Sequence, residues 1–162
     1  MITIAPLQPH QVPEAKLVLA TVAFPIFKET GTLEEYIALI EAEHALADVE
    51  NFQAGYNENG GLFLAELDDG KVIGTGAIRR MDDETAELRR MWLLQEYHGQ
   101  KIGYRIVQRL FATAREKGYR RVRLMTNHVQ VEAVTFYRKL GFYEIPSYDP
   151  ESGDDLAMEL VL

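Results

Sequence analysis

The strongest constraint on the fold is a run of three strand-like segments joined by two short acidic turns. Residues 62–67, 72–79 and 85–94 are rich in apolar and β-branched residues, and the turns are Asp68-Asp69-Gly70 and Asp82-Asp83-Glu84. Turns this short connect antiparallel neighbours, because parallel strands need a much longer crossover. The sequence therefore predicts an antiparallel three-stranded meander.

Helical periodicity lies on both sides of this meander. Apolar residues recur at helical spacing over residues 14–23 and 33–44 before it, and over residues 102–114 and 131–140 after it. Glycines at positions 118 and 141 are typical ends for the last two helices.

Four further strands complete the expected sheet, at the N-terminus around Ile2 and over residues 122–126, 142–145 and 156–162. No linker or internal repeat divides the chain. We predict a single α/β (α+β) domain over residues 1–162, with a mixed, mostly antiparallel sheet of about six to seven strands flanked by about four helices.

The third meander segment changes face near its middle. Apolar residues lie on one face up to Leu88 and on the other from Met91 onward. A one-residue β-bulge near Arg89 and Arg90 would restore a single apolar face. The alternative is that both faces are buried, since Trp92 is apolar as well.

Charge is unevenly distributed along the chain. The 162 residues include 17 Lys and Arg against 25 Asp and Glu, a net charge of −8 that argues against a general nucleic-acid coat. Residues 71–139 nonetheless hold 15 of the basic residues and only 7 of the acidic ones. This basic middle suggests a local anion site, with solvated basic faces as the alternative.

Missing residue types narrow the chemistry. There is no cysteine, so a disulfide framework, a thiolate metal site and a cysteine nucleophile are excluded. The four histidines lack metal-ligand spacing, and we expect no metal. The chain opens without a basic leader and has no apolar stretch long enough for a bilayer, so we expect a cytoplasmic protein with neither membrane nor nucleic-acid partners.

The densest chemical signal is a glycine-bearing turn between a strand and a helix, His98-Gly99-Gln100-Lys101-Ile102-Gly103-Tyr104-Arg105. Such a turn presents free backbone N–H groups and the positive end of the helix dipole to phosphate oxygens. Its spacing matches neither GxxxxGK[ST] nor GxGxxG, so neither of those nucleotide-binding loops is indicated.

Three separated segments carry a family resemblance. They are Glu87-Leu88-Arg89-Arg90-Met91-Trp92-Leu93, then Tyr97-His98-Gly99-Gln100-Lys101-Ile102-Gly103, and, after Asn127 and Ala133, Phe136-Tyr137-Arg138-Lys139-Leu140-Gly141-Phe142. Over roughly residues 62–145 the chain resembles the GNAT superfamily of acyl-CoA-dependent N-acyltransferases. The resemblance implies the GNAT fold and transfer of an acetyl group from acetyl-CoA to a primary amine.

The resemblance also implies the residues that bind CoA. The family turn follows [Q/R]-x-x-G-x-[G/A], which puts His98, Lys101 and Gly103 at its three signature positions, so two of them depart from the pattern. The bulged strand would bind the pantetheine arm through its backbone, and Asn127 through its amide, unless Asn127 only forms a turn. The implied set is Met91, Trp92, Leu93, His98, Gly99, Gln100, Lys101, Ile102, Gly103, Tyr104, Arg105, Asn127 and Tyr137.

Tyr137 matches the tyrosine that faces the thioester sulfur in many family members. A phenol of pKa about 10, held close to the sulfur, can act as proton donor to the leaving thiolate, whose pKa is roughly 8.5 by analogy with cysteine. The alternative for Tyr137 is core packing. Because the chain has no cysteine, we expect direct attack in a ternary complex rather than a covalent acyl-enzyme.

The acceptor ammonium needs a general base, and the resemblance indicates Glu87. The alternative for Glu87 is an ion pair with Arg89, or with Arg79 or Arg80 across the hairpin. A water and His128 are other candidate bases. His98 is a further candidate, but its presence is better explained by a role in the turn before the helix.

The acceptor pocket is expected between the early helices, the strand bearing Glu87 and the loop of residues 147–154. The implied substrate-binding residues are Phe24, Phe27 and Glu87. The acidic character of these segments favours a cationic small-molecule or peptide amine, such as a polyamine, an amino sugar or a protein lysine, and surface acidity for solubility is the alternative. A homodimer is compatible with the sequence.

Two other functions are compatible with these features. A catalytically silent acyl-CoA-binding or regulatory module would bind the cofactor without turnover. An RNA-binding protein would use the basic run of residues 115–123 and would bind in a salt-dependent way. Most of that basic charge is expected on the outer face of one helix and strand, which argues against RNA.

Overall fold

The computed structural model describes residues 1–27 and 30–162. Its centre is one seven-stranded sheet in the order β1-β2-β3-β4-β5-β7-β6, in which only β4 and β5 are parallel neighbours. The predicted meander and the mostly antiparallel sheet are confirmed. The strands are β1 (Ile2–Pro6), β2 (Leu62–Asp68), β3 (Lys71–Arg80), β4 (Thr85–Leu93), β5 (Arg121–Thr126), β6 (Tyr143–Ile145) and β7 (Leu156–Val161).

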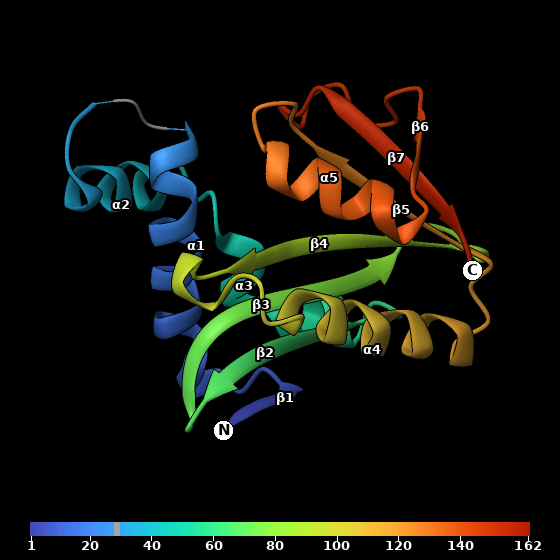
Figure 1. The fold of residues 1–162 in the computed structure, drawn as a ribbon, viewed down its shortest axis with the longest axis horizontal. Helices are drawn as coiled ribbons and strands as arrows, with labels where there is room; N and C mark the ends of the chain where they lie inside the picture. The colour runs from blue at the N-terminus through green and yellow to red at the C-terminus, as the bar shows by residue number, and fades with distance from the viewer. Residues whose placement is uncertain (28–29) are drawn as a thin grey trace.

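Helices cover both faces of this sheet (Figure 1). The four longer ones agree with the prediction, whereas α3 and the π-turn η2 are too short to produce a periodic pattern and were not predicted. No helix within residues 1–27 and 30–162 is long and apolar enough to cross a membrane. The helical segments are η1 (Pro9–Gln11), α1 (Val12–Phe27), α2 (Leu33–Ala42), α3 (Ala47–Glu50), η2 (Gln53–Asn57), η3 (Gln95–Tyr97), α4 (Ile102–Glu116) and α5 (Val131–Leu140).

Two apolar clusters hold these layers together, one on each face of the sheet. The first joins α4 and α5 to the strands, and the second joins α1, α3 and η2 to the opposite face. In α4 the predicted apolar stripe is fully buried, and Gly118, with φ of 90°, follows its C-terminal end. Burial of this stripe fixes the rotation of α4, and with it the direction of the turn that precedes it.

The predicted bulge in β4 is confirmed at Arg90. The ladder between β3 and β4 passes from the pair Ala77↔Arg89 to the pair Thr75↔Trp92, which leaves one extra residue in β4. Arg90 has φ of 57°, in the left-handed region that non-glycine residues seldom adopt. The extra residue changes which side chains of β4 point to each face of the sheet, so that Trp92 packs on the face covered by α1.

The sheet divides between β4 and β5. These strands share only three residue pairs, of which Glu87↔Arg123 is the last. Beyond this pair β4 continues beside β3 and β5 continues beside β7, and the two halves of the sheet diverge (Figure 1). The edge of β4 that faces the divergence carries backbone groups that no strand pairs with, which is unusual at the centre of a sheet.

Glu66 of β2 places a carboxyl group inside the protein. The residue is 1% exposed, and its Oε2 has no hydrogen-bond partner within residues 1–27 and 30–162. Burial raises the pKa of Glu66 from 4.5 to about 8, although the Arg105 guanidinium acts in the opposite direction. The folded protein therefore keeps this carboxyl protonated under conditions in which the unfolded chain ionises it.

We predict that Glu66 makes the protein less stable as pH rises from about 5 towards 8. In this window the folded state holds a proton that the unfolded state has released, so the free energy of unfolding falls by roughly 1 kcal/mol per pH unit. Glu66→Gln should remove this contribution, as measured by urea unfolding at several pH values. The exposed Glu58→Gln is the control, and equal pH slopes for wild type and Glu66→Gln would contradict the prediction.

Candidate functional site

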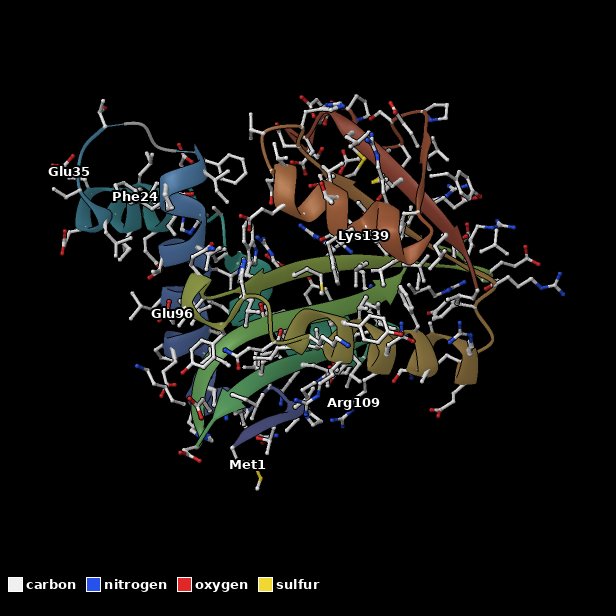
Figure 2. All side chains as sticks on the ribbon, in the orientation of Figure 1. Met1, Phe24, Glu35, Glu96, Arg109 and Lys139 are labelled. Carbon is white, nitrogen blue, oxygen red and sulfur yellow. The ribbon has the colours of Figure 1, made fainter. Side chains whose placement is uncertain are left out.

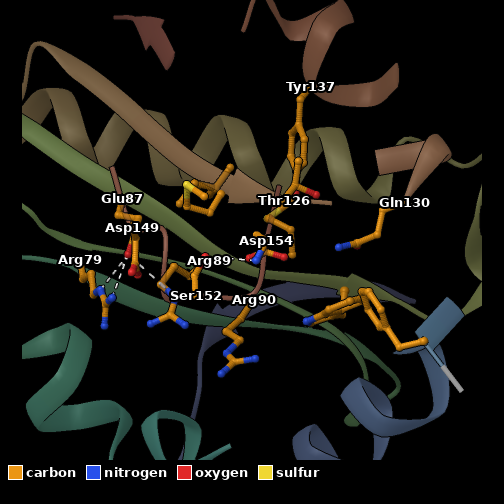
Figure 3. Close-up of a pocket in the computed structure, with 15 residues that line it drawn as sticks. Arg79, Glu87, Arg89, Arg90, Thr126, Gln130, Tyr137, Asp149, Ser152 and Asp154 are labelled. Carbon is orange, nitrogen blue, oxygen red and sulfur yellow. Dashed lines mark hydrogen bonds and ion pairs between the residues drawn. The ribbon is translucent and has the colours of Figure 1, made fainter. Parts of the chain in front are cut away.

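A cleft of about 340 Å³ opens where β4 and β5 separate. One wall is β4, and the end of β5, α5, the end of α1 and the loop before β7 complete it (Figure 3). The lining residues are Phe27, Arg79, Glu87, Leu88, Arg89, Arg90, Met91, Trp92, Met125, Thr126, Gln130, Tyr137, Asp149, Ser152 and Asp154. The fold thus brings together three of the regions that the sequence indicated, namely the bulged strand, the α5 tyrosine and the loop before β7.

Tyr137 extends from α5 into this cleft (Figure 3). Its side chain packs between Phe136 and Phe142, with ring centroids 5.8 and 5.7 Å away. Burial, and to a smaller extent the Asp154 carboxylate, raises the pKa of Tyr137 well above its ordinary value of 10. The phenol is therefore protonated at neutral pH and can donate a hydrogen bond to a group in the cleft.

Glu87 is buried where β4 and β5 part, and both of its carboxylate oxygens have partners. Arg79 Nη2 lies 2.9 Å from Oε1, and the Tyr148 hydroxyl donates a hydrogen bond of 2.9 Å to Oε2. Arg89 Nε is farther away, at 3.9 Å from Oε1. The structure thus contains the ion pair across the hairpin that was the alternative for Glu87, together with a contact from Tyr148 that the sequence did not suggest.

Asp154 is a second carboxylate in the cleft, and it was not singled out from the sequence. Burial raises the pKa of Asp154 above its ordinary value, while the Arg89 guanidinium acts in the opposite direction. Its backbone N–H is bonded to Ser152 Oγ at 3.2 Å, and within residues 1–27 and 30–162 its carboxylate forms no ion pair. The loop containing Asp154 was predicted to line the pocket, and the structure places two of its acidic residues there, Asp149 and Asp154.

The turn before α4 has the geometry of an anion site. Lys101 precedes the first helical residue with φ of 61°, and no side chain caps the helix there. The first intrahelical bond begins at Arg105 N, which donates to Lys101 O at 3.0 Å. The backbone N–H groups of Ile102, Gly103 and Tyr104 therefore precede the helical ladder, as expected for the first turn of a 15-residue helix.

Gly103 keeps space open beside these amides. A Cβ at this position would meet only Phe136 Cζ, at 3.8 Å, which is an ordinary contact distance. Packing within the protein does not require glycine here, and the backbone is helical. The absence of a side chain instead allows a ligand to approach the amides closely, and a diphosphate fits this donor set.

The other expected cofactor and base residues make contacts within the protein. His98 Nε2 lies 3.0 Å from the Leu93 carbonyl oxygen, and its Nδ1 lies 3.2 Å from the Glu132 carboxylate. His98 therefore links the end of β4 to the first turn of α5, directly beside the cleft.

Asn127 and His128 lie outside the residues that line the cleft. Asn127 Oδ1 accepts a hydrogen bond of 3.3 Å from Val129 N, which is the turn-forming alternative, and His128 Nδ1 lies 2.9 Å from Asp155. Within residues 1–27 and 30–162, no group of three or more His, Asp or Glu side chains is arranged to hold a metal ion.

The two phenylalanines of α1 have different positions. Phe27 lines the cleft, whereas Phe24 packs against Tyr36 of α2, with ring centroids 5.7 Å apart (Figure 2). The structure therefore places only Phe27 where it can contact a substrate.

The charge of the cleft differs from the acidic pocket that we expected. Its lining holds the three arginines at positions 79, 89 and 90 and the three carboxylates at positions 87, 149 and 154. The acidic excess of the early helices and the last loop lies mostly on other surfaces, because charge counted along a segment does not show which side chains turn inward.

Arg90 is held by a hydrogen-bonded cluster behind the bulge. Its Nη2 and Nε donate to the two oxygens of Asp48 at 2.6 and 3.0 Å, and its Nη2 also donates to Ala45 O at 3.0 Å. Tyr56 donates a further bond of 2.5 Å to Asp48. Burial acts to raise the pKa of Asp48, but the bonds from Arg90 outweigh it and the net pKa is lowered. Asp48 is 42 residues from Arg90 in the chain, so no sequence motif indicated this pair.

Comparison with known proteins identifies relatives of this chain. Residues 26–142 match the model of the acetyltransferase (GNAT) family. An uncharacterised N-acetyltransferase of Mycobacterium tuberculosis is 35% identical over 79 residues, which are 49% of this chain and 51% of that protein. The human N-acetyltransferase 8B is 32% identical over 101 residues, which are 59% of this chain and 44% of that protein. The chain thus spans about half the length of the curated relatives it matches.

Solved structures resemble the whole chain. An acetyltransferase of the GNAT family from Staphylococcus aureus superposes with a TM-score of 0.85 at 21% identity, covering 100% of this chain and 99% of its own. The PaiA N-acetyltransferase from Thermoplasma acidophilum, solved in complex with coenzyme A, gives 0.83 at 23% identity with the same coverage. At these identities the likeness is one of fold, and it confirms the predicted architecture.

We predict that Asp48→Asn destabilises the protein by about 2–3 kcal/mol, because it leaves the largely buried Arg90 guanidinium without its counter-charge. Urea unfolding checks this value. Asp83→Asn is the matched control, since it removes the partner of Arg80 in an exposed pair and should cost less than about 1 kcal/mol. Equal losses in the two variants would show that the Arg90 cluster does not hold the bulge.

Proposed function

The chain belongs to the GNAT acetyltransferase family, and we propose that it transfers an acetyl group from acetyl-CoA to a primary amine by direct attack in a ternary complex. The observation that carries this proposal is the divergence of β4 and β5. It opens a cleft lined by β4 and Tyr137. The open first turn of α4 lies outside this lining but next to α5, where a Cβ on Gly103 would come within 3.8 Å of Phe136. An extended ligand with phosphates at one end and a thioester at the other fits this arrangement.

The donor side of the site supports acetyl-CoA. The backbone amides from Gln100 to Arg105 would hold the diphosphate, and the side-chain charges of Lys101 and Arg105 would add to the attraction. Met91, Trp92 and Leu93 belong to the part of β4 that continues beyond its last pair with β5, and backbone groups there that point away from β3 would bind the amide groups of the pantetheine arm. The coenzyme A bound by the PaiA structure is consistent with this assignment.

Tyr137 acts on the departing sulfur. The donor supplies a thioester, whose thiolate leaving group has a pKa of roughly 8.5, whereas the pKa of Tyr137 is raised above 10. Full transfer of the phenol proton is uphill by more than about 1.5 pKa units, or about 2 kcal/mol. Tyr137 therefore stabilises the developing thiolate by donating a hydrogen bond, which strengthens as negative charge accumulates in the transition state.

The acceptor must lose a proton before its nitrogen can attack. Asp154 lines the cleft, and burial raises its pKa above the ordinary value, which makes its carboxylate a better proton acceptor, directly or through a water. Glu87 is the alternative base, as the family resemblance implies, although its oxygens are already bonded to Arg79 and Tyr148. In this assignment Glu87 positions those two side chains along the acceptor side of the cleft.

We predict that Tyr137→Phe lowers kcat by about 10²-fold while coenzyme A binding changes little, because only the hydrogen bond to the leaving sulfur is lost. Release of free thiol from acetyl-CoA, measured over a panel of amines, checks this. The protein has no cysteine, so a thiol reagent reports coenzyme A alone.

Tyr143→Phe on the exposed strand β6 is the control for Tyr137→Phe and should retain activity. Coenzyme A binding without turnover of any amine would identify a silent binding module instead. The absence of both binding and turnover would contradict the proposed function.

We predict that Gly103→Ala has opposite effects on folding and on coenzyme A binding. Alanine favours the helix by about 0.5 kcal/mol over glycine near its end, and the structure has room for the added methyl group. The same methyl group obstructs the approach of the diphosphate, so the dissociation constant for coenzyme A should rise about 10-fold. Urea unfolding and calorimetric titration measure the two effects.

Gln108→Ala, on the exposed face of α4, is the control for Gly103→Ala because it raises helix propensity without altering the turn. Unchanged affinity for coenzyme A in Gly103→Ala would show that the diphosphate does not bind at these amides.

A further inference from the structure

The three arginines of the cleft are not equivalent. Arg79 is paired with Glu87 at 2.9 Å, and Arg90 is paired with Asp48 at 2.6 Å. Each of these guanidinium groups therefore has a counter-charge at hydrogen-bond distance within the protein, and neither is available to neutralise a charged ligand.

Arg89 has no such partner within residues 1–27 and 30–162. Its Nε lies 3.9 Å from Glu87 Oε1, which is too far for a hydrogen bond. That oxygen is already bonded to Arg79 at 2.9 Å. The Arg89 side chain is only 30% exposed and lines the cleft. The N–H groups of Arg89 are therefore available to bind a carboxylate that a ligand brings into the cleft.

Groups suited to an amine lie elsewhere in the same cleft. Figure 3 shows the side chains of Arg79 from β3 and of Arg89 and Arg90 from β4 on one side, while Tyr137 enters from α5 on the other. Asp154 belongs to the loop before β7 and carries a carboxylate that can receive an ammonium group. The cleft therefore offers a positive group and a negative group to one small molecule.

We propose that the acceptor is a small amine that also carries a carboxylate, of the free amino acid class, and that Arg89 binds that carboxylate. This inference rests on the proposed function, because it names the acceptor of the same cleft. The planar guanidinium holds the carboxylate through two parallel N–H···O bonds, and the amine is directed towards Asp154 and Tyr137.

The same charges disfavour the other acceptors that the sequence suggested. A polyamine carries no negative group, so it would bring positive charge near Arg89 and would not supply the carboxylate that this guanidinium can bind. An amino sugar or a lysine side chain has no negative group to pair with Arg89. The cleft volume of about 340 Å³ also lies near the lower limit for small-molecule sites, which favours a compact acceptor.

The test compares matched acceptors in the thiol-release assay with acetyl-CoA. For each of several free amino acids, kcat/KM is compared with that of two matched compounds: the amino acid carboxamide, and the amine in which the carboxylate is absent. We expect the wild-type protein to use the amino acids with kcat/KM at least about 10-fold above that for the other two forms, because only they bind Arg89.

Arg89→Gln should remove this preference. We expect KM for the amino acids to rise about 10- to 100-fold with little change in kcat, while the values for the acceptors without a carboxylate and for coenzyme A binding stay the same. Arg89→Lys keeps the positive charge but loses the planar pair of N–H donors, and should retain part of the preference for amino acids. Arg120→Gln, which removes an exposed arginine outside the cleft, is the matched control.

The outcomes separate this inference from the function on which it rests. Equal or better use of amines without a carboxylate would overturn the role of Arg89 and leave acetyl transfer intact. So would an equal loss for all acceptors in Arg89→Gln. Failure of every acceptor to release thiol would overturn both statements. Urea unfolding of Arg89→Gln shows whether a loss reflects misfolding, and the preference of the wild-type protein for amino acids over carboxamides does not depend on any variant.

Discussion

The bulge at Arg90 and the separation of β4 from β5 are the constraint on which the rest of the site depends. A left-handed backbone at a non-glycine residue costs about 1–2 kcal/mol, and the ion pair between Arg90 and Asp48 opposes that cost. Thr75 Oγ1 donates a hydrogen bond of 2.7 Å to the Arg90 carbonyl oxygen and holds the other side of the bulge. With β4 held in this way, its outer edge stays free of a partner strand and can bind a ligand.

Opening a sheet at its centre creates two kinds of surface. Along β4 the surface is backbone, which suits a long and chemically repetitive ligand such as pantetheine. Around Glu87 the surface consists of charged side chains, which suit a small acceptor and can distinguish one acceptor from another. In the proposed function the donor is therefore bound mainly by backbone groups, while the choice of acceptor depends on individual charges. Among the three arginines of the cleft, Arg89 is the one without a carboxylate at hydrogen-bond distance within residues 1–27 and 30–162.

Local pattern and tertiary contact contributed to different parts of this site. The parity change in β4 indicated the bulge, the glycine-bearing turn indicated the anion site, and the spacing around Tyr137 indicated its place on α5. Asp48 and Tyr148 could not be found in this way, because they reach Arg90 and Glu87 from 42 and 61 residues away. The acidic pocket was expected from segment charge, and that reasoning failed because it cannot show which side chains face inward.

The sequence by itself determined the order of the strands and of the four longer helices along the chain and the buried stripe of α4, and it indicated the bulge as one of two possibilities. Each of these depends on residues within a few positions of one another, where periodicity and turn chemistry act directly. Only the tertiary structure decided which charges meet in the cleft, that Arg79 and Tyr148 are bonded to Glu87, and that Arg89 stays 3.9 Å from it. Ion pairing depends on distances of a few ångströms between side chains of different elements, and these distances are set by packing.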